Sequence, residues 1–591
     1  MTDYQAPLRD MRFVMYEVFD ISKTWAQWPD TKGLIDPTTA DAILEESARL
    51  ASQVLAPINR SGDEEGCQWD SGSVTTPTGF KAAYDQFAQG GWVSLSGNPD
   101  YGGMGMPKVL SAQFDEMQCS ANPSFILYPS LTSGACLAID AHASDQLKAT
   151  YLPNLYSGKW AATMCLTEAH AGTDLGMIRT KATENGDGSY AITGTKIFIT
   201  GGEHDLTENI IHLVLAKLPE APAGPKGISI FLVPKIHVND DGSLGKRNGV
   251  TSGSIEHKMG IKASATSVMN FDGATGYLIG EVNKGLNIMF TMMNYERLLV
   301  GVQGLGSSEM SYQVALAYAK DRRQGRAATG IIDKDQPADS LMVHGDVRRM
   351  LLNMKALNEA GRAFSTYVAQ QLDIVRFSES EEEKQKASAL SALLTPVVKA
   401  FLTDMGFESC VTGQQVLGGH GYIREWGQEQ RVRDVRITQI YEGTNGIQAL
   451  DLLGRKIIAN EGAFFHVFIT EVRSSMDKSD DFAQPLLSAV DQLEALTQDI
   501  LAKADNNPNV VNSACMDYLH SLGYIAYGWM WALMVKTARH AIASGNTDPM
   551  YQAKLVTGRY YFRRLLPKAS ALMASAGSGT EELFNLTEKD F

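Results

Sequence analysis

The stretch ITQIYEGTNGIQALDLLGRK, residues 437–456, carries more information about fold and function than any other part of the sequence. An apolar run ends at YEGT (441–444), and apolar residues then recur at helical spacing. Thr444 or Asn445 is suited to cap this helix, because either side chain accepts a free N–H group of the first turn. Glu442 therefore precedes a helix N-terminus, beside a glycine that lets a ligand approach the backbone. From spacing alone Glu442 is a candidate general base, and a solvated or capping carboxylate is the simpler alternative.

Two further stretches contain residue types that are suited to a ligand. MCLTEAHAGTDLGMIRTKA (164–182) is rich in Thr, Gly and Ala, which let backbone amides and hydroxyls line a flat ring or a phosphate. A polar loop is the alternative. QVLGGHGYIREW (415–426) has the glycines of a loop, but it does not fit G-x-G-x-x-G and follows no strand of a βαβ unit. GVQGLG (301–306) lies in helical sequence and fails the same test, so a Rossmann site is not predicted.

The remaining sequence predicts an α–β–α order. Residues 1 to about 160 show helical periodicity, for example after Asp36-Pro37, a helix-start signal. Residues 160–280 contain short β-branched runs between turn residues, which are typical of antiparallel strands in a small sheet or barrel. Helical periodicity returns at Gly285. The predicted fold class is α+β, mainly α, in four parts: an N-terminal helical domain with an N-terminal extension (1–160), a middle β domain (161–284), a helical bundle (285–460) and an additional helical domain (461–591).

Composition excludes several classes of protein. The 591 residues are 44% hydrophobic and 20% charged, which is typical of a globular chain and excludes wholesale disorder. A net charge of −15 argues against a general nucleic-acid or anionic-membrane surface. No two of the six cysteines form a C-x-x-C pair, so neither a zinc ribbon nor a disulfide framework is indicated, and a reducing compartment is favoured. The N-terminus has no apolar signal region. The charge-free stretch between Asp517 and Lys536 is interpreted as a buried helix, with a membrane-touching helix as the minor alternative.

Several ordered motifs resemble those of the acyl-CoA dehydrogenase family. CLTEAHAGTD (165–174) is similar to the family's first signature, VRDVRITQIYEGTNGIQ (432–448) to its second, and GTKIFITGG (194–202) to its flavin-flanking strand. The resemblance covers residues of about 40 to 460. The N-terminal segment and the long C-terminus resemble the larger bacterial members, which include fatty acyl-CoA and 3-methylmercaptopropionyl-CoA dehydrogenases. The fold implied is a helical N-terminal domain, a middle β-barrel-like domain, a C-terminal four-helix bundle and an extra helical extension.

The resemblance also implies an activity. The expected reaction is FAD-dependent introduction of a trans-2,3 double bond into a fatty acyl-CoA, with medium to long chains favoured. Electrons would pass to electron-transfer flavoprotein, as in fatty acid β-oxidation. Glu442 matches the base that removes the α-proton, and its backbone N–H matches a donor to the thioester oxygen. Desolvation is expected to raise the pKa of this carboxylate. Glu296, directly before Arg297, is the alternative base, and the two carboxylates are expected to share the site.

Further positions match cofactor and substrate contacts of the family. The residues expected at FAD are Met164, Leu166, Thr167, Thr173, Phe198, Thr200, Arg322, Gln415, Gly418, Gly419, Thr444 and Gly446. The residues expected at the acyl-CoA are Thr173, Asn294, Arg297, Tyr441 and Gly443. No metal is expected. Arg322 matches an arginine that reaches the FAD of a neighbouring subunit, so a homo-oligomer, with a dimer favoured, is predicted.

Three alternatives remain open at this point. The chain can be a 3-methylmercaptopropionyl-CoA dehydrogenase instead of a general fatty acyl-CoA dehydrogenase. An acyl-CoA oxidase, which reduces oxygen, is the nearest enzymatic rival. A non-catalytic, DNA-binding relative from the alkylation response is disfavoured, because residues 461–591 carry an excess of acidic residues. Neither nucleic acid binding nor a transmembrane segment is expected. A cytoplasmic location is expected.

Overall fold

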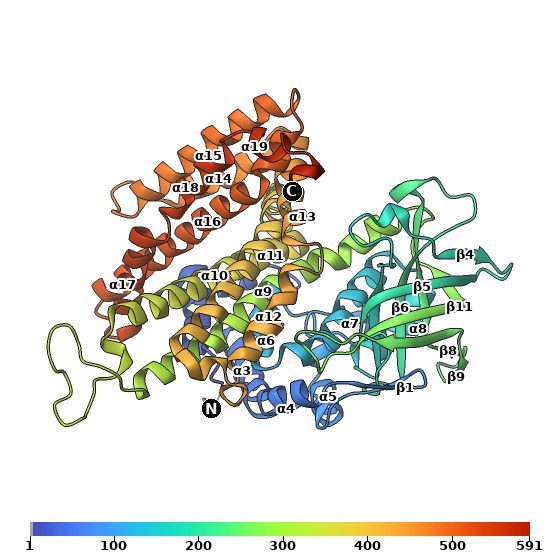
Figure 1. Cartoon of the computed structure of the whole chain (residues 1–591). Helices are drawn as coiled ribbons and strands as arrows, with labels where there is room; N and C mark the ends of the chain where they lie inside the picture. Colours follow the sequence, from blue (N-terminus) through green and yellow to red (C-terminus); the bar gives the residue numbers. More distant parts are fainter. Residues whose placement is uncertain (1–3) are drawn as a thin grey trace. The chain divides into compact units, whose positions relative to one another are not determined.

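The computed structural model describes residues 4–591, apart from the side chain of Asn294, and the chain forms two compact units. Unit 1 comprises Met1–Ala48, Lys108–Ser120 and Arg297–Phe591, and unit 2 comprises Arg49–Pro107 and Ala121–Glu296. Figure 1 shows the elements along the chain. Helices dominate, and the strands fall mainly in the middle of the sequence, as the α+β, mainly α, fold class predicts. The boundaries of the four predicted domains stay a prediction.

Unit 2 is built around a seven-stranded mixed sheet. Its strands are β3 (Trp160–Cys165), β4 (Lys181–Glu184), β5 (Tyr190–Thr200), β6 (Asn209–Lys217), β7 (Ile228–Pro234), β10 (Val250–Ile255) and β11 (Thr266–Leu278). The pairings β11–β5, β5–β4, β4–β6, β6–β7 and β7–β11 close into a ring, so the barrel-like expectation is confirmed. The all-antiparallel expectation is wrong, because β3 runs parallel to β6, and β4 also meets β6 in parallel.

The middle strands are long apolar runs because both of their faces are buried. Alternate residues of β6 belong to different cores: Leu213 packs in one, and Val214 packs in the other. Since side chains alternate across a strand, a strand covered on both sides loses its polar positions. The core that contains Leu213 is completed by residues of three helices, for example Ala135, Leu152 and Met289.

Further elements complete unit 2. Its helices are α4 (Asn59–Glu65), α5 (Phe80–Gln89), α7 (Pro123–His142) and α8 (Asp145–Tyr156). Two strand pairs lie outside the main sheet: β1 (Gln68–Asp70) with β2 (Ser73–Thr75), and β8 (Ile236–Val238) with β9 (Leu244–Arg247). The β1–β2 hairpin adds a short strand pair to the predominantly helical N-terminal region.

Unit 1 contains the long helices. They are α9 (Gly285–Asp321), whose first residues belong to unit 2, α10 (Gly345–Phe377) and α11 (Glu381–Leu417), followed by α12 (Gln428–Val435) and α13 (Asn445–Leu450). The N-terminal helices are α1 (Leu8–Arg12), α2 (Ile21–Gln27), α3 (Pro37–Leu50) and α6 (Lys108–Ala121). The prediction of a helix after Asp36 is confirmed, and the Asp36 carboxylate accepts the N–H of Thr39 at 2.7 Å.

The glycines at 301–306 allow close helix packing and do not bind a nucleotide through a glycine-rich loop. A Cβ at Gly301 would lie 2.7 Å from the Val398 carbonyl oxygen, and one at Gly304 would lie 2.8 Å from that of Leu402. Glycine at these positions therefore lets α9 and α11 approach through their backbones, as at other small-residue helix contacts.

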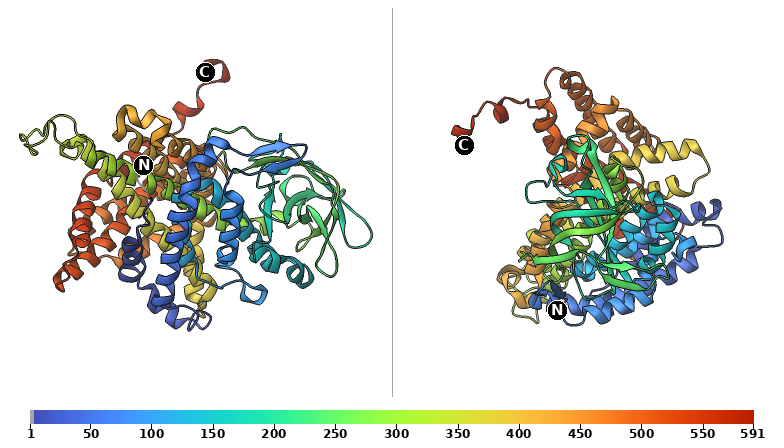
Figure 2. Two further views of the ribbon diagram at one scale, coloured as in Figure 1. Left: turned by 90° about the horizontal axis from the view of Figure 1, so that it is seen from below. Right: turned by 90° about the vertical axis from the view of Figure 1, so that its right-hand side faces the viewer.

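The C-terminal extension packs against the bundle mainly through one long helix. Its helices are α14 (Ala463–Ser475), α15 (Ala483–Ala504), α16 (Asn509–Ala543), α17 (Pro549–Arg564), α18 (Lys568–Ala576) and α19 (Glu581–Phe584). Helix α16 contacts α10, α11 and α13, and its middle is almost entirely buried, which confirms the prediction for residues 517–536. The orange and red helices of the extension lie side by side in Figures 1 and 2. Among the described residues one segment, Glu381–Tyr422, is long and apolar enough to cross a membrane, but most of its apolar window is buried in the protein.

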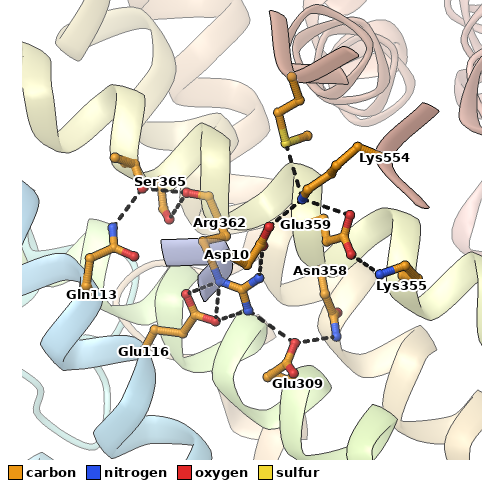
Figure 3. A network of polar contacts seen from close by, with 12 residues as sticks. Asp10, Gln113, Glu116, Glu309, Lys355, Asn358, Glu359, Arg362, Ser365 and Lys554 are labelled. Carbon is orange, nitrogen blue, oxygen red and sulfur yellow. Dashed lines mark hydrogen bonds and ion pairs between the residues drawn. The ribbon is translucent and has the colours of Figure 1, made fainter. Parts of the chain in front are cut away.

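A buried ionic network joins the N-terminal segment, the bundle and the extension within unit 1 (Figure 3). Arg362 on α10 donates to Glu116 on α6 at 3.0 Å and to Glu309 on α9 at 3.1 Å. It also pairs with Asp10 of α1, which in turn pairs with Lys554 of α17. Because buried charges need partners, this network fixes how the five helices α1, α6, α9, α10 and α17 come together.

Candidate active site

Glu442 lies in a strained turn between two short helices. Its φ is +56°, a left-handed conformation that is uncommon outside glycine, and Gly443 follows with φ +83°. The turn begins after the 3₁₀ segment Arg436–Gln439 and ends at α13. Thr444 caps α13, since its hydroxyl accepts the Ile447 N–H at 3.4 Å, so one of the two predicted capping residues is confirmed.

Two side chains hold the backbone carbonyls of this turn. Gln448 donates from Nε2 to the Glu442 carbonyl oxygen at 3.0 Å. Lys399 on α11 donates from Nζ to the Gly443 carbonyl oxygen at 2.8 Å and to Asn445 Oδ1 at 2.8 Å. The Lys399 side chain is fully buried. A strained backbone conformation persists only where surrounding contacts stabilise it, and these hydrogen bonds stabilise the Glu442 turn.

The carboxylate of Glu442 has one oxygen that is free for chemistry. The side chain is half-buried, and its Oε2 atom is buried without a hydrogen-bond partner among the described residues. Burial raises the pKa of Glu442, although the positive charges of Arg297 and Lys399 oppose this rise. Burial likewise lowers the pKa of Lys399, to about 7, against the attraction of Glu442 and Asp404. A carboxylate with a raised pKa and an unpartnered oxygen is suited to accept a proton.

Two predicted substrate residues, Arg297 and Tyr441, make polar contacts with other side chains of unit 1. Arg297 is buried, and its Nη1 lies 3.5 Å from Asp451 Oδ2. The Tyr441 hydroxyl donates to Gln303. Both are therefore placed beside the Glu442 turn, with polar partners inside unit 1. The side chain of Asn294 lies outside the described residues.

The alternative base, Glu296, belongs to unit 2. It is 3% exposed, and its carboxylate lies against Gly134 of α7, where a side chain larger than hydrogen would collide with it. Because Glu442 belongs to unit 1, the expectation that the two carboxylates share one site stays a prediction.

Most of the other cofactor residues predicted in unit 1 are exposed, and Gly446 is half-buried. Arg322 directly follows α9, and its guanidinium has no carboxylate partner among the described residues. Gln415 lies in the last turn of α11, and Gly418 and Gly419 open the 3₁₀ turn that follows, where a Cβ added to either glycine would meet no atom within 4 Å. The predicted loop after α11 is thus confirmed. Gly446 lies in the first turn of α13.

Unit 2 presents a second group of predicted cofactor residues at the ends of β3 and β5. Thr167 follows β3, and its carbonyl oxygen accepts the Ile197 N–H of β5 at 2.9 Å. Thr200 ends β5. Phe198 lies on β5 shortly before Thr200, and it has φ +60° and a side chain that is 59% exposed. The half-buried hydroxyls of both threonines lack hydrogen-bond partners among the described residues. An exposed aromatic ring and two open hydroxyls on neighbouring strand ends fit a flat, polar ring such as that of FAD.

Three other predicted residues occupy the same part of unit 2. Met164 is half-buried in β3, and Leu166 directly after that strand is buried. Thr173 is exposed in the loop that follows. The Leu166 carbonyl oxygen accepts a hydrogen bond from Lys196, whereas Thr173 lies on the surface of unit 2 with no side-chain hydrogen bond among the described residues.

Sequence reasoning missed the residues that fix these backbones. In unit 2 the buried Lys196 donates to the Leu166 carbonyl oxygen and to Glu168 Oε1, both at 2.9 Å. Burial acts to raise the pKa of Glu168, but the charge of Lys196 and several hydrogen bonds lower it to about 2. In unit 1 the missed residue is Lys399, whose one local signal is a single charge inside the apolar run TPVVKAF (395–401).

Comparison with known proteins extends over nearly the whole chain. Family profiles match for the acyl-CoA dehydrogenase N-terminal domain (38–159), the middle domain (163–274), the C-terminal domain (283–457) and an acetyl-CoA dehydrogenase C-terminal-like region (468–587). The chain is 42% identical to the 3-methylmercaptopropionyl-CoA dehydrogenase of Ruegeria pomeroyi, over 96% of this chain and 97% of that protein.

Two other relatives agree with these matches. The chain is 34% identical to a butyryl-CoA dehydrogenase of Syntrophomonas wolfei, over 100% of this chain and 99% of that protein. The solved acyl-CoA dehydrogenase of Bacillus anthracis, a complex with FAD, shares the fold with a TM-score of 0.73 at 22% identity, over 95% of this chain and 91% of that one. The chain therefore belongs to the acyl-CoA dehydrogenase family, whose members are FAD-dependent oxidoreductases.

Proposed function

We propose that this protein catalyses FAD-dependent α,β-dehydrogenation of an acyl-CoA thioester, with Glu442 as the base. The observation that carries the proposal is the conformation of Glu442: a buried, unpartnered carboxylate oxygen on a left-handed residue whose carbonyl and neighbour are tied down by Gln448 and Lys399. Its raised pKa makes it a stronger base than an ordinary surface carboxylate.

The chain's own groups have distinct roles in this reaction. Glu442 removes the α-proton of the thioester. Its backbone N–H, which has no acceptor among the described residues, donates to the thioester oxygen and stabilises the charge that develops there. FAD, when bound, accepts the hydride from the β-carbon. Glu296 is assigned a supporting role.

We assign FAD binding to the two groups of open polar residues. Thr167 and Thr200 supply hydroxyls, and Phe198 supplies an aromatic face, in unit 2. In unit 1 the exposed Arg322 suits a pyrophosphate, because a guanidinium pairs with phosphate oxygens through two parallel hydrogen bonds. The remaining predicted contacts are Met164, Leu166, Thr173, Gln415, Gly418, Gly419, Thr444 and Gly446. The roles of Asn294, Arg297, Tyr441 and Gly443 at the acyl-CoA are part of the same proposal.

For the substrate we propose a short acyl-CoA, with 3-methylmercaptopropionyl-CoA as the first candidate. The support is the 42% identity to a dehydrogenase that is named for this thioester, over nearly all of both chains. A linear acyl-CoA is the second candidate, which the butyryl-CoA dehydrogenase relative favours. These two relatives favour a shorter chain than the medium-to-long chain expected from the sequence, which is the third candidate; a place in β-oxidation stays a prediction. We further propose electron-transfer flavoprotein as the electron acceptor, a homodimer as the active form and the cytoplasm as the location.

A panel of thioesters tests this proposal. Purified protein is expected to be yellow with non-covalent FAD, and an accepted acyl-CoA should bleach the flavin under anaerobic conditions. The panel contains 3-methylmercaptopropionyl-CoA and linear acyl-CoAs from about four to about twenty carbons, and the limiting reduction rate is measured for each. Air should reoxidise the product complex only slowly, whereas rapid reoxidation indicates an oxidase. Protein that takes up FAD but is bleached by no thioester contradicts the proposed function.

A further inference from the structure

We propose that His520, in the C-terminal extension, is a positioning residue for Glu442, acting through Asp404 and Asn445. The inference rests on the role proposed above for Glu442. It gives the C-terminal extension a part in the chemistry, because His520 lies on α16 of that extension.

Asp404 on α11 joins the two ends of the Glu442 turn. One oxygen, Oδ1, accepts a hydrogen bond from Gln439 Nε2 at 2.7 Å and another from Asn445 Nδ2 at 2.6 Å. Gln439 is the last residue before the turn, and Asn445 is the first residue of the helix after it. A single carboxylate oxygen therefore clamps both flanks of residues 440–444.

His520 holds the other oxygen of this carboxylate. Its Nε2 lies 2.8 Å from Asp404 Oδ2, and the side chains of His520 and Asp404 are 21% and 14% exposed. The imidazole also packs edge-on against Phe401 of α11, with ring centroids 5.7 Å apart and an angle of 87° between the planes. These two contacts fix the ring, and the ring fixes the orientation of the carboxylate plane.

The clamp continues to the backbone beside Glu442. Asn445 uses its amide nitrogen toward Asp404 and its carbonyl oxygen toward Lys399 Nζ, at 2.8 Å. Lys399 then holds the Gly443 carbonyl oxygen. Asn445 is 6% exposed and Lys399 is fully buried, so water cannot replace these hydrogen bonds readily. The chain of contacts from α16 to the catalytic turn is continuous and protected from solvent over its inner part.

The electrostatics of Asp404 agree with this geometry. Burial acts to raise the pKa of Asp404, but hydrogen bonds from His520, Gln439 and Asn445 outweigh it, and the pKa lies below its ordinary value. The carboxylate is thus ionised and is stabilised by the groups it holds. Removal of the His520 ring leaves Oδ2 without this donor, and the carboxylate is then free to rotate away from the flanks of the turn.

His520→Ala in the full-length holoenzyme tests the proposal. We expect the limiting rate of flavin reduction to fall by about tenfold or more, because small displacements of a catalytic group are costly, while the dissociation constant of the thioester changes by less than about twofold. His520→Gln keeps a side-chain N–H donor and should stay within about threefold of the unchanged protein. His540→Ala is the matched control, since His540 lies exposed on the same helix and should leave the rate unchanged.

Hydrogen–deuterium exchange supplies a readout that does not depend on turnover. In His520→Ala, peptides covering residues 440–448 should exchange faster, with the rest of α16 unchanged. Unchanged reduction rate and unchanged exchange at 440–448 would overturn the proposal. Equal slowing in His520→Ala and His520→Gln, with faster exchange throughout unit 1, would show a general structural role and would also overturn it. If no thioester reduces the unchanged protein, the proposed function fails, whereas the exchange result still decides whether His520 holds the turn.

Discussion

Glu442 and Phe198 are both non-glycine residues in the left-handed region, and both lie at predicted site positions. Such a conformation costs about 1–3 kcal/mol and needs support from its surroundings. The conformation is not confined to the site, since Asn283 and Glu461 share it. At Glu442 the support is visible as hydrogen bonds from Gln448 and Lys399 to the carbonyls of the turn. The supported turn therefore holds the Glu442 carboxylate in one position, which a flexible loop would not do.

Lys399→Met should shift the pH dependence of the chemical step. Glu442 must be ionised to accept a proton, so the rate rises with pH through its pKa. The Lys399 cation lowers that pKa, and its removal should therefore raise it and move the acid limb of the rate to higher pH. Anaerobic stopped-flow reduction of the flavin from about pH 5 to about pH 9 measures the limb.

The matched control for this experiment is Lys386→Met. Lys386 is an exposed lysine on the same helix, paired with Glu471 away from the turn, so its loss should leave the profile in place. An acid limb that does not move in Lys399→Met, in protein that keeps its FAD, would show that the Lys399 charge does not act on Glu442.

At the scale of elements, unit 1 combines close helix contacts with a buried ionic network. The glycines of α9 bring backbones together, whereas Arg362 joins α10 to α1, α6 and α9 through ion pairs with Asp10, Glu116 and Glu309. Burial raises the pKa of Glu116 to about 7, and the Arg362 charge opposes this. Arg362 is therefore the cation that Asp10, Glu116 and Glu309 share.

Arg362→Ala should destabilise the protein strongly. Removal of one partner from a buried ionic cluster costs about 3–5 kcal/mol, because the carboxylates that remain are desolvated and repel one another. Denaturant unfolding followed by circular dichroism measures the change. Arg559→Ala, at an exposed position of α17, should change the free energy of unfolding by less than about 0.5 kcal/mol. Similar values for the two variants would contradict a stabilising role for the network.

At the scale of the whole molecule, features set by neighbouring residues were predictable from the sequence. The helix after Asp36, the return of helix at Gly285, the loop after α11 and the cap at Thr444 all follow from local signals: capping residues, apolar periodicity and glycines. Glu442 stood out for the same reason, because a turn and a helix start surround it. Its role, however, became a definite expectation only through the ordered motifs of the family.

Features that join distant residues were not predictable. The parallel pairing of β3 with β6 depends on how the chain crosses the sheet, and apolar runs of this kind do not reveal strand direction. Asp404 and His520 meet across 116 positions of the sequence, and neither has a neighbouring residue that indicates the contact. The local sequence shows Lys399 only as a charged residue within an apolar run. A lysine more often lies at the surface than in the core, so its burial was not predictable.

Anaerobic stopped-flow reduction of the flavin in Glu442→Gln and Glu296→Gln tests whether Glu442 is the base. Glutamine keeps the size and hydrogen-bonding shape of the side chain but cannot take the α-proton. We expect Glu442→Gln to bind the thioester while flavin reduction falls by at least ~10²–10⁴-fold, the loss typical of a general base, and Glu296→Gln to be milder. Near-normal reduction in Glu442→Gln together with slow reduction in Glu296→Gln would show that Glu296, and not Glu442, is the base.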